Sequence, residues 1–324
     1  MRATFLQILF CFISCYLFTG TGYSQVTEIT KYPTKAITFI SPMQPGSGMD
    51  LACRLICNAT EKYLGQRVVM VNKPGATFTI GTAAIASSKP DGYAIGMPGP
   101  PAVFMASQIE KIPFHALKDL KWIMQFGYFN FGVIVKNDSS FKSFKDVVEY
   151  SRQNPKKLIN GCGGIGGIGH TLMEQVAMKE GVKVTHMPFK GGPDTEKALL
   201  GGHIHIMTGD INYSLLEAGQ TRLLALLAEN RSVCYPQTPT LKELGYEIPS
   251  STILPIAGPK GLPEEIVKRL EEAFTKAMKE REFIDGMRRI RYTVAHRNSQ
   301  ELEDYVSRTY EAYTKLLRQM TLIK

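Results

Sequence analysis

The sequence predicts an α/β protein built as two similar lobes, and two observations carry this prediction. Short apolar runs alternate with amphipathic helical patterns, which is typical of βαβ units and of sheets with parallel strands. The alternation runs through two cycles, the second of which starts after Phe126. In each cycle a glycine-rich loop joins a strand to a helix, at residues 42–50 and 161–170.

The first 24 residues have the pattern of a secretory signal peptide. Arg2 precedes an apolar stretch from Phe5 to Phe18, and small and polar residues follow as far as Ser24. About 14 apolar residues are too few to span a bilayer but match the core of a cleaved leader. Cys15 fits a lipid-attachment site poorly because Phe12 stands where such sites usually carry Leu. We therefore expect export to the periplasm without a lipid anchor.

Composition excludes several classes of protein. The 324 residues suffice for two ordinary domains, and 44% hydrophobic with 21% charged residues describes a folded chain. Lys and Arg number 38 against 29 Asp and Glu, giving a formal charge of +9. No run of five or more basic residues occurs, so we expect no nucleic-acid partner. A mildly basic surface and a bias toward small anions both fit this charge.

The first cycle begins with a buried strand and the first glycine-rich loop. The helix that follows has apolar residues at helical spacing and ends at Gly65, a typical C-cap. The expected strands and helices are strand 36–40, helix 49–64, strand 68–71, helix 79–87 and strand 94–97.

The second cycle repeats this plan, and the C-terminal segment returns to helices. Ser143 is expected to cap one helix, Pro263 to open another, and Asn298 with Glu301 to form a capping box before the last. The expected elements of the second cycle are strand 131–135, helix 144–153, helix 170–180, strand 182–186, helix 194–200, strand 204–207 and strand 223–227.

Each glycine-rich loop places backbone N–H groups at the start of a helix, where the helix dipole adds partial positive charge. Such a cradle attracts an anion, either a carboxylate or a phosphate. Because the chain has two of them, we expect two half-sites that face one ligand.

The sequence lacks two features that nucleotide-binding proteins need, a ribose-binding acid and a P-loop lysine. The second loop matches G-x-G-x-x-G at Gly161, Gly163 and Gly166. The next strand ends at residues 186–190 without the acid that would hold the ribose hydroxyls. Neither loop contains the Gly-Lys-Ser/Thr of a P-loop.

Metal and catalytic sites receive little support. No C-x-x-C occurs, Cys53 and Cys57 lie one helical turn apart in poor geometry for a disulfide, and His203 and His205 share a strand face without a third ligand. We therefore expect neither a metal nor a cofactor.

The main catalytic alternative is an exported enzyme with Cys162 as nucleophile and His170 as base. The competing interpretation places Cys162 in a small polar slot beside a bound ligand. No orienting acid is obviously placed, so we favour a binding protein over an enzyme.

An ordered set of motifs resembles a known family. These motifs occupy residues 32–35, 45–50, 72–76, 89–93, 161–170, 186–191, 199–202 and 218–226. Together they resemble the solute-binding proteins of tripartite tricarboxylate transporters, the Bug or TctC-like family, nearly end to end after the leader.

The resemblance implies a two-lobed periplasmic-binding-protein fold of the type II kind. Each lobe would be a mostly parallel sheet flanked by helices, with the ligand in the cleft between the lobes. Residues 25–128 and 250–324 would form lobe one and residues 129–249 lobe two, with residues 1–24 removed as the signal peptide.

The resemblance also implies that the two loops hold a ligand carboxylate through backbone N–H groups and bridging water. Phe78 and Asp210 are expected to join the loops in the site. Asp50 has an alternative role as a helix cap, and His170 has one in hydrogen bonding to its own loop. The expected loop residues are Met43, Gly46, Ser47, Gly48, Met49, Asp50, Gly161, Cys162, Gly164, Ile165, Gly166, Gly167 and His170.

Departures from the family pattern predict a more apolar pocket. Gly48 and Met49 stand where the family usually carries Ser-Thr, and Gly167, Ile168 and Gly169 replace further hydroxyl residues. We expect a monomer that binds a small organic acid or amide and meets a tripartite membrane permease, or alternatively a sensor protein.

Overall fold

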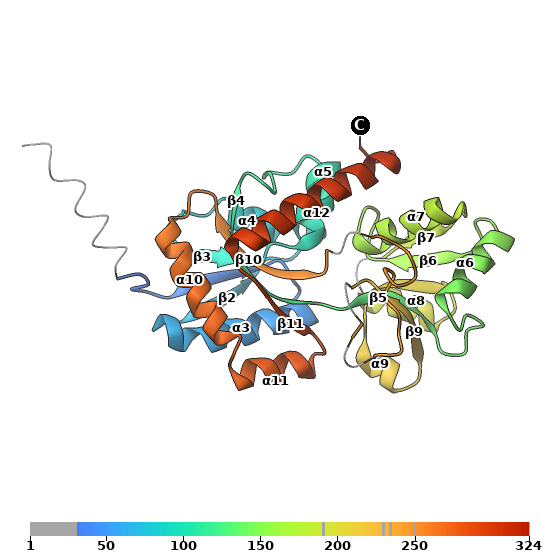
Figure 1. The fold of residues 1–324 in the computed structure, drawn as a ribbon, viewed down its shortest axis with the longest axis horizontal. Helices are drawn as coiled ribbons and strands as arrows, with labels where there is room; N and C mark the ends of the chain where they lie inside the picture. The colour runs from blue at the N-terminus through green and yellow to red at the C-terminus, as the bar shows by residue number, and fades with distance from the viewer. Residues whose placement is uncertain (1–30, 190–191, 229–230, 233–234, 249–250, 324) are drawn as a thin grey trace, which may run out of the picture.

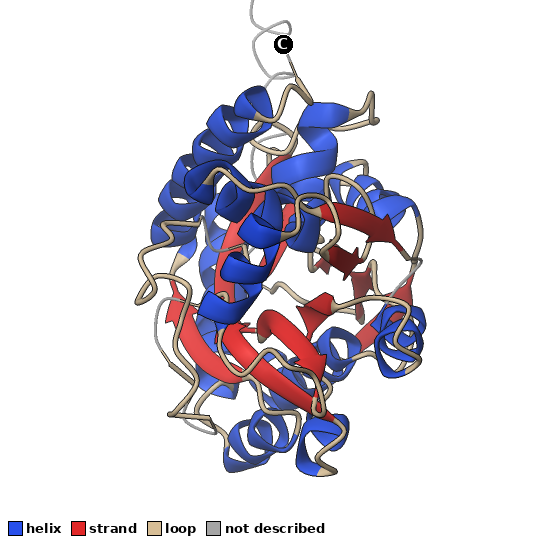
Figure 2. Ribbon diagram, turned by 90° about the vertical axis from the view of Figure 1, so that its right-hand side faces the viewer, coloured by secondary structure: helices blue, strands red, loops and turns tan. Residues whose placement is uncertain are grey.

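A computed structural model describes residues 31–323 except 190–191, 229–230, 233–234 and 249–250. The expected signal peptide and Cys234 lie outside the described residues. Two mixed sheets organise the chain, each with helices packed on it (Figures 1 and 2). We call the first sheet with its helices the first lobe, and the second sheet with its helices the second lobe.

The first sheet has the strand order β11-β4-β10-β3-β1-β2. β1 is parallel to β2 and β3, whereas β10 is antiparallel to β3 and β4, and β11 is antiparallel to β4. Its strands are β1 (Ile37–Ser41), β2 (Val68–Asn72), β3 (Ala94–Gly96), β4 (Leu120–Tyr128), β10 (Ile253–Pro259) and β11 (Thr293–Arg297).

Among the described residues, eight helical segments belong to the first lobe. They are α3 (Gly48–Leu64), η1 (Ala76–Phe78), α4 (Thr79–Ala86), η2 (Ala102–Ala106), α5 (Ser107–Ile109), α10 (Glu264–Ala277), α11 (Arg281–Arg289) and α12 (Ser299–Gln319). α12 lies along the top of the first lobe in Figure 1, and its C-terminal end points toward the second lobe. No helix in the described ranges has the length and apolar character needed to cross a membrane.

The second sheet has the strand order β7-β6-β8-β5-β9. β6 is parallel to β7 and β8, whereas β5 is antiparallel to β8 and β9. Its elements are β5 (Phe131–Lys136), α6 (Phe144–Gln153), β6 (Ile159–Cys162), α7 (Ile168–Glu180), β7 (Thr185–Pro188), α8 (Gly192–Leu200), β8 (Ile206–Asp210), α9 (Tyr213–Glu217) and β9 (Thr221–Leu226).

The expected two-lobed α/β fold is confirmed, but both sheets are mixed rather than mostly parallel, because the strands beside the crossings between the lobes run antiparallel to their neighbours. β4 leads into β5, and β10 follows the return from the second lobe. Each lobe therefore combines parallel βαβ strands with antiparallel crossing strands. The expected strands 182–186 and 204–207 also lie two to three residues further along the chain, as β7 and β8.

Local signals placed several helix ends correctly. The hydroxyl of Ser143 accepts from the Asp146 N–H, and Asp146 accepts from the Ser143 N–H in return. Asn298 and Glu301 make the same reciprocal pair at the start of α12, and Gly65 ends α3 at a φ of 69°. These motifs supply partners for backbone groups that a helix end leaves unpaired.

The crossings between the lobes lie side by side. The N–H of Phe129 donates to the carbonyl of Thr252 at 2.9 Å, which joins the outgoing segment to the returning one. A large apolar core continues from Phe126 and Ile256 of the first lobe to Val133 and Leu172 of the second. The lobes are therefore packed against each other near the crossings.

Candidate functional site

The two glycine-rich loops meet at a cleft of about 430 Å³ lined by residues of both lobes. This volume lies in the usual range for small-molecule sites. Two more open depressions of about 590 Å³ lie around Tyr246, away from both loops. The cleft is the candidate site because helix N-termini, aromatic side chains and an acid converge there.

The first loop presents the start of α3 to the cleft. Ser47 caps the helix, and its hydroxyl accepts from the Asp50 N–H at 3.3 Å. The N–H groups of Gly48 and Met49 donate to no acceptor among the described residues. Met49 lines the cleft, so one of these two N–H groups belongs to a cleft residue.

Asp50 holds this loop from behind. Its carboxylate is buried and accepts from the Gly46 N–H at 2.9 Å, from Asn72 Nδ2 at 2.6 Å and from Arg54 Nε at 2.9 Å. Burial alone would raise its pKa, but these hydrogen bonds hold the pKa below its ordinary value. Of the two roles considered for Asp50, the observed contacts are those of loop support.

The second loop presents the start of α7 to the opposite side of the cleft. Gly167 occupies the cap position and has no side chain to bind the first N–H groups. The N–H groups of Ile168 and Gly169 have no described acceptor, and both residues line the cleft. Two helix N-termini therefore lie at the same cleft, each with N–H groups that have no described acceptor.

The backbone conformation at residue 166 favours glycine. Its φ of +75° lies in the left-handed region, which a side chain disfavours. A Cβ at this position would also lie 2.8 Å from Cδ1 of Ile109 in the first lobe. The second loop thus approaches the first lobe at Gly166, where the left-handed backbone disfavours a side chain.

His170 supports the second loop with a hydrogen bond. The Gly166 N–H donates to His170 Nδ1 at 3.0 Å. Burial, with a smaller contribution from His186, lowers the pKa of His170 to about 4, so the ring is neutral at pH 7 and its other nitrogen carries the hydrogen. This is the loop-bonding role named as the alternative to ligand contact.

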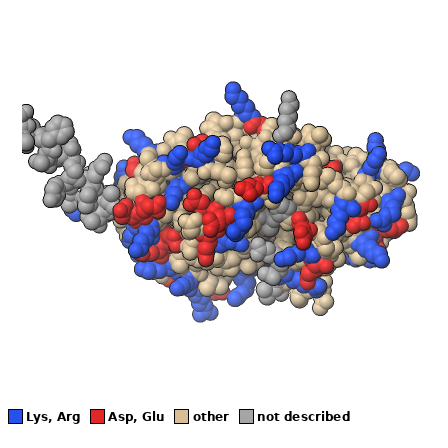
Figure 3. Space-filling view, turned by 45° about the horizontal axis from the view of Figure 1, so that its top comes forward, with Lys and Arg blue, Asp and Glu red and all other residues tan. Residues whose placement is uncertain are grey.

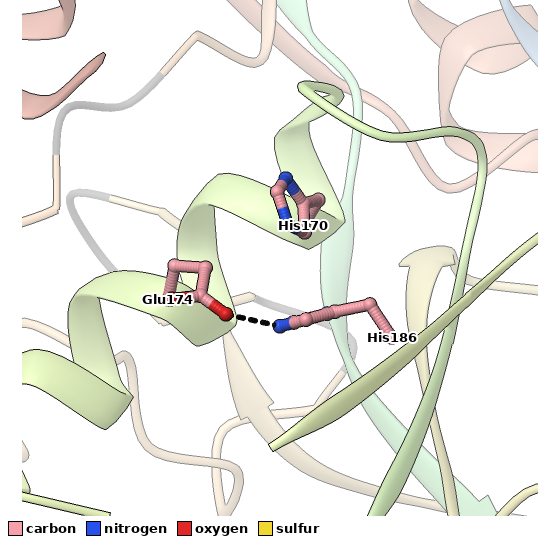
Figure 4. A group of neighbouring side chains, drawn as sticks. All are labelled: His170, Glu174 and His186. Carbon is pink, nitrogen blue, oxygen red and sulfur yellow. Dashed lines mark hydrogen bonds and ion pairs between the residues drawn. The ribbon is translucent and has the colours of Figure 1, made fainter. Parts of the chain in front are cut away.

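Glu174 and His186 complete a cluster with His170 (Figure 4). Glu174 Oε1 and His186 Nε2 are 2.7 Å apart. His186 also contacts Asn160, whose Oδ1 accepts from the hydroxyl of Thr208, a cleft residue. A hydrogen-bonded chain thus runs from the cleft through β6 and β7 to α7.

This cluster offers three ligand atoms within 4.8 Å of one another, a spacing at which a metal ion can bind. A metal on either nitrogen of His170 would break the hydrogen bond from Gly166, because a neutral ring has one free lone pair. A metal on His186 Nε2 would replace its bond to Glu174. The observed hydrogen bonds account for all three side chains as supports of the loop.

The cleft wall between β2 and α4 has an unusual backbone. Ala76, Thr77 and Phe78 have φ values of 45°, 50° and 70°, and all three line the cleft. Three consecutive left-handed residues other than glycine are costly, and such conformations occur preferentially at functional sites. The turn places Phe78 in the lining of the cleft.

The structure divides the expected site residues into two groups. Met49, Phe78, Gly164, Gly167 and Asp210 line the cleft. The others do not line it: Met43, Asp50 and Cys162 are buried behind the loops, Ile165 is exposed, and Gly46, Ser47, Gly48, Gly161, Gly166 and His170 shape the loops.

Sequence reasoning missed several cleft residues. Phe129 and Phe131 come from the crossing segment, while Phe189 and Thr208 follow or belong to strands of the second sheet. Their strand patterns indicated burial, but nothing local indicated that these buried faces would meet at a cleft. The contact between Glu174 and His186 beside His170 was also missed, because these residues come together only in the fold.

The catalytic alternative is contradicted. The Cys162 side chain is buried, and burial raises its pKa to about 11, which disfavours the reactive thiolate. Its sulfur lies 3.6 Å from the Gly164 carbonyl, while His170 is engaged with Gly166. The nucleophile and base of a thiol enzyme are therefore not paired.

Two α/β lobes around a cleft lined from both sides define the class of two-lobed solute-binding receptors. A family model described as "Tripartite tricarboxylate transporter family receptor" matches residues 52–322. The chain belongs to this family, and it is a receptor of a transport system rather than an enzyme.

Relatives support the assignment over most of the chain. A Cupriavidus necator protein described as "UPF0065 protein in gbd 5'region" is 32% identical over 298 residues, covering 92% of this chain and 91% of that protein. Protein BugT of Bordetella pertussis is 28% identical, covering 82% and 83%. The solved structure of a TctC solute binding protein from Polaromonas is 28% identical with a TM-score of 0.74, covering 89% and 99%.

Proposed function

We propose that this protein is an extracytoplasmic receptor that captures a small carboxylate, or a related amide, and delivers it to a membrane permease of the tripartite type. The observation that carries the proposal is the pair of helix N-termini with free N–H groups on both sides of the cleft. A carboxylate accepts through two oxygens, so one group can bind Met49 on one side and Ile168 and Gly169 on the other.

Three further features support a binding role. Family membership supplies the transport context, and the family's description names tricarboxylates. The second loop approaches Ile109 of the first lobe, so a movement of the lobes would change the position of this loop. Lys and Arg are interspersed with Asp and Glu on the face in Figure 3, without a basic tract of the kind that binds nucleic acid.

The domain limits inferred from the sequence remain part of this proposal. Lobe one would comprise residues 25–128 and 250–324, and lobe two residues 129–249, with the signal peptide 1–24 removed on export. In this proposal the mature protein is a monomer that closes around its ligand and then meets the permease.

Isothermal titration with mono- and dicarboxylates tests the proposal. Ile168 is the first residue of α7, where proline is tolerated, so Ile168→Pro removes one N–H group while keeping the helix. We expect Ile168→Pro to lose about tenfold in affinity, or about 1.4 kcal/mol.

Ile168→Ala is the matched control, since it shortens the side chain and keeps the N–H group. Circular dichroism checks that both variants fold. Equal affinity of the two variants for every carboxylate that the wild type binds would remove the start of α7 from the site.

A further inference from the structure

We propose that Asp210 selects ligands that carry a protonated amine in addition to their carboxylate. This inference rests on the carboxylate-binding function proposed above and names the ligand class of the same cleft. It is carried by the position of Asp210, by its lack of partners, and by the side chains around it.

Asp210 lies at the end of β8, paired along the backbone with Phe131 of β5. Its side chain is exposed to the cleft. Among the described residues that line the cleft it is the sole ionisable one. The charged side chains among these residues therefore favour a cation, whereas the helix N-termini favour an anion.

The carboxylate of Asp210 makes no hydrogen bond or ion pair with any residue in the described ranges. Asp50 differs in this respect, because both of its oxygens already accept hydrogen bonds. A carboxylate without a partner in a confined site is costly to ionise, and a donor or cation from a ligand would remove that cost.

The groups facing Asp210 add to this preference. Glu196 of α8 repels it, and surrounding protein atoms together with Glu196 raise the pKa of Asp210 to about 7. Burial also raises the pKa of Glu196. Burial and the charge of Asp210 raise the pKa of Tyr292 of the first lobe, so Tyr292 is a neutral phenol. A second ligand carboxylate placed here would meet two acids and no described cation.

Aromatic side chains suit a ligand with an apolar body and a cationic end. Phe78, Phe129, Phe131 and Phe189 all line the cleft. Ring faces attract ammonium groups as well as apolar surface, typically by about 0.5–2 kcal/mol. The ligand we infer has a carboxylate at the helix N-termini, an apolar middle and an ammonium group at Asp210.

Matched sets of linear acids test this inference, because the members of a set differ at one end. The sets are succinate, glutarate and adipate, the ω-amino acids with the same numbers of carbons, and the corresponding unsubstituted acids. Isothermal titration at pH 8 measures each affinity for the mature protein. In the best-binding length we expect the amino acid to bind about tenfold more tightly than the dicarboxylate.

Asp210→Asn should abolish this preference without unfolding the protein, since the amide has the same shape and no charge. We expect it to weaken the amino acid about tenfold and to leave the dicarboxylate unchanged or tighter. Asp138→Asn is the matched control, because Asp138 is an exposed acid of the same lobe that pairs with Lys136. This variant should keep the wild-type ratio of the affinities for the amino acid and the dicarboxylate.

A pH series supplies an independent readout. The ionised form of Asp210 binds the ammonium group, so wild-type affinity for the amino acid should fall as the pH decreases from 8 to 6. Asp210→Asn should lack this fall.

The outcomes separate the two proposals. The inference is wrong if the dicarboxylate binds more tightly than the amino acid at every length and Asp210→Asn does not change the ratio of the two affinities. This result would leave the proposed capture of carboxylates unaffected. Binding of none of these acids contradicts carboxylate capture itself and removes the basis of the inference.

Discussion

Two aspartates beside the same cleft have opposite environments. Asp50 is saturated with hydrogen bonds from Gly46, Asn72 and Arg54, and its pKa is lowered. Asp210 has no described partner, and its pKa is raised to about 7. The first aspartate is thus a structural support, whereas the second is free for a ligand.

Replacing Asp50 by Asn should destabilise the protein by about 1–3 kcal/mol at pH 7, because a charged acceptor of three donors is lost. The lowered pKa means that this stabilisation is present above the ordinary pKa of 3.8 and disappears as the pH falls below it. Urea unfolding of both proteins at pH 7 and near pH 3 measures the difference.

Asp138→Asn serves as the comparison for Asp50→Asn, since it removes an exposed acid. An equal loss of stability in the two variants at pH 7 would contradict the supporting role of Asp50.

At the scale of elements, α7 does more than expose its first N–H groups. Its His170 bonds the Gly166 N–H, and its Glu174 bonds His186 of β7. The helix therefore fixes the loop that precedes it and the strand that follows it. Both contacts lie on the side of the loop that does not line the cleft.

The lowered pKa of His170 predicts a pH-dependent stability. An unfolded His170 binds a proton near pH 6.5 and the folded one near pH 4, so stability should decrease as the pH falls through this interval. Replacing His170 by Gln should flatten this part of the profile. Thermal unfolding of the two proteins between pH 7 and pH 4 measures the effect.

His203→Gln provides the control for this comparison, because His203 is exposed on the same lobe. The prediction fails if His170→Gln and wild type lose stability in parallel over the interval.

Features that depend on neighbouring residues could be predicted from the sequence. Features that depend on contacts between distant segments could not. The caps at Ser143 and Asn298 and the end of α3 at Gly65 depend on residues within one turn. The antiparallel pairing of β5 and the contact of His186 with Glu174 depend on segments brought together by the fold. The glycine-rich loops predicted two helix N-termini, but no local pattern predicted that Phe129, Phe131 and Phe189 would line the same cleft.

At the scale of the whole molecule, contacts outside the cleft also join the lobes. Arg291, which follows α11, pairs with Glu217 of α9 and lies over the ring of Tyr213. The side chain of Asn130 donates to the carbonyl of Arg291 at the crossing. These contacts favour the arrangement in which the two helix N-termini face each other.

Replacing Glu217 by Gln should shift the lobes toward the open form. Both partners are partly exposed, so the pair contributes about 0–1 kcal/mol and the affinity should fall no more than about fivefold. High salt should remove the difference between variant and wild type because it screens exposed charges. Titrations at low and high salt measure it.

Glu247→Gln is a suitable control, since Glu247 is an exposed acid of the second lobe near Tyr246. An affinity loss that persists in high salt would contradict an electrostatic contribution of Glu217.

The hydrogen bond between Phe129 and Thr252 has a consequence for how such a receptor can diversify. Because this bond ties the outgoing and returning segments together, we expect any movement of one lobe against the other to pivot near Phe129 and Thr252. If the lobes close about one axis, they bring the same outer surfaces together whichever solute occupies the cleft. Substitutions at cleft positions such as Asp210 would then change the ligand without changing the outer surface that a transporter recognises.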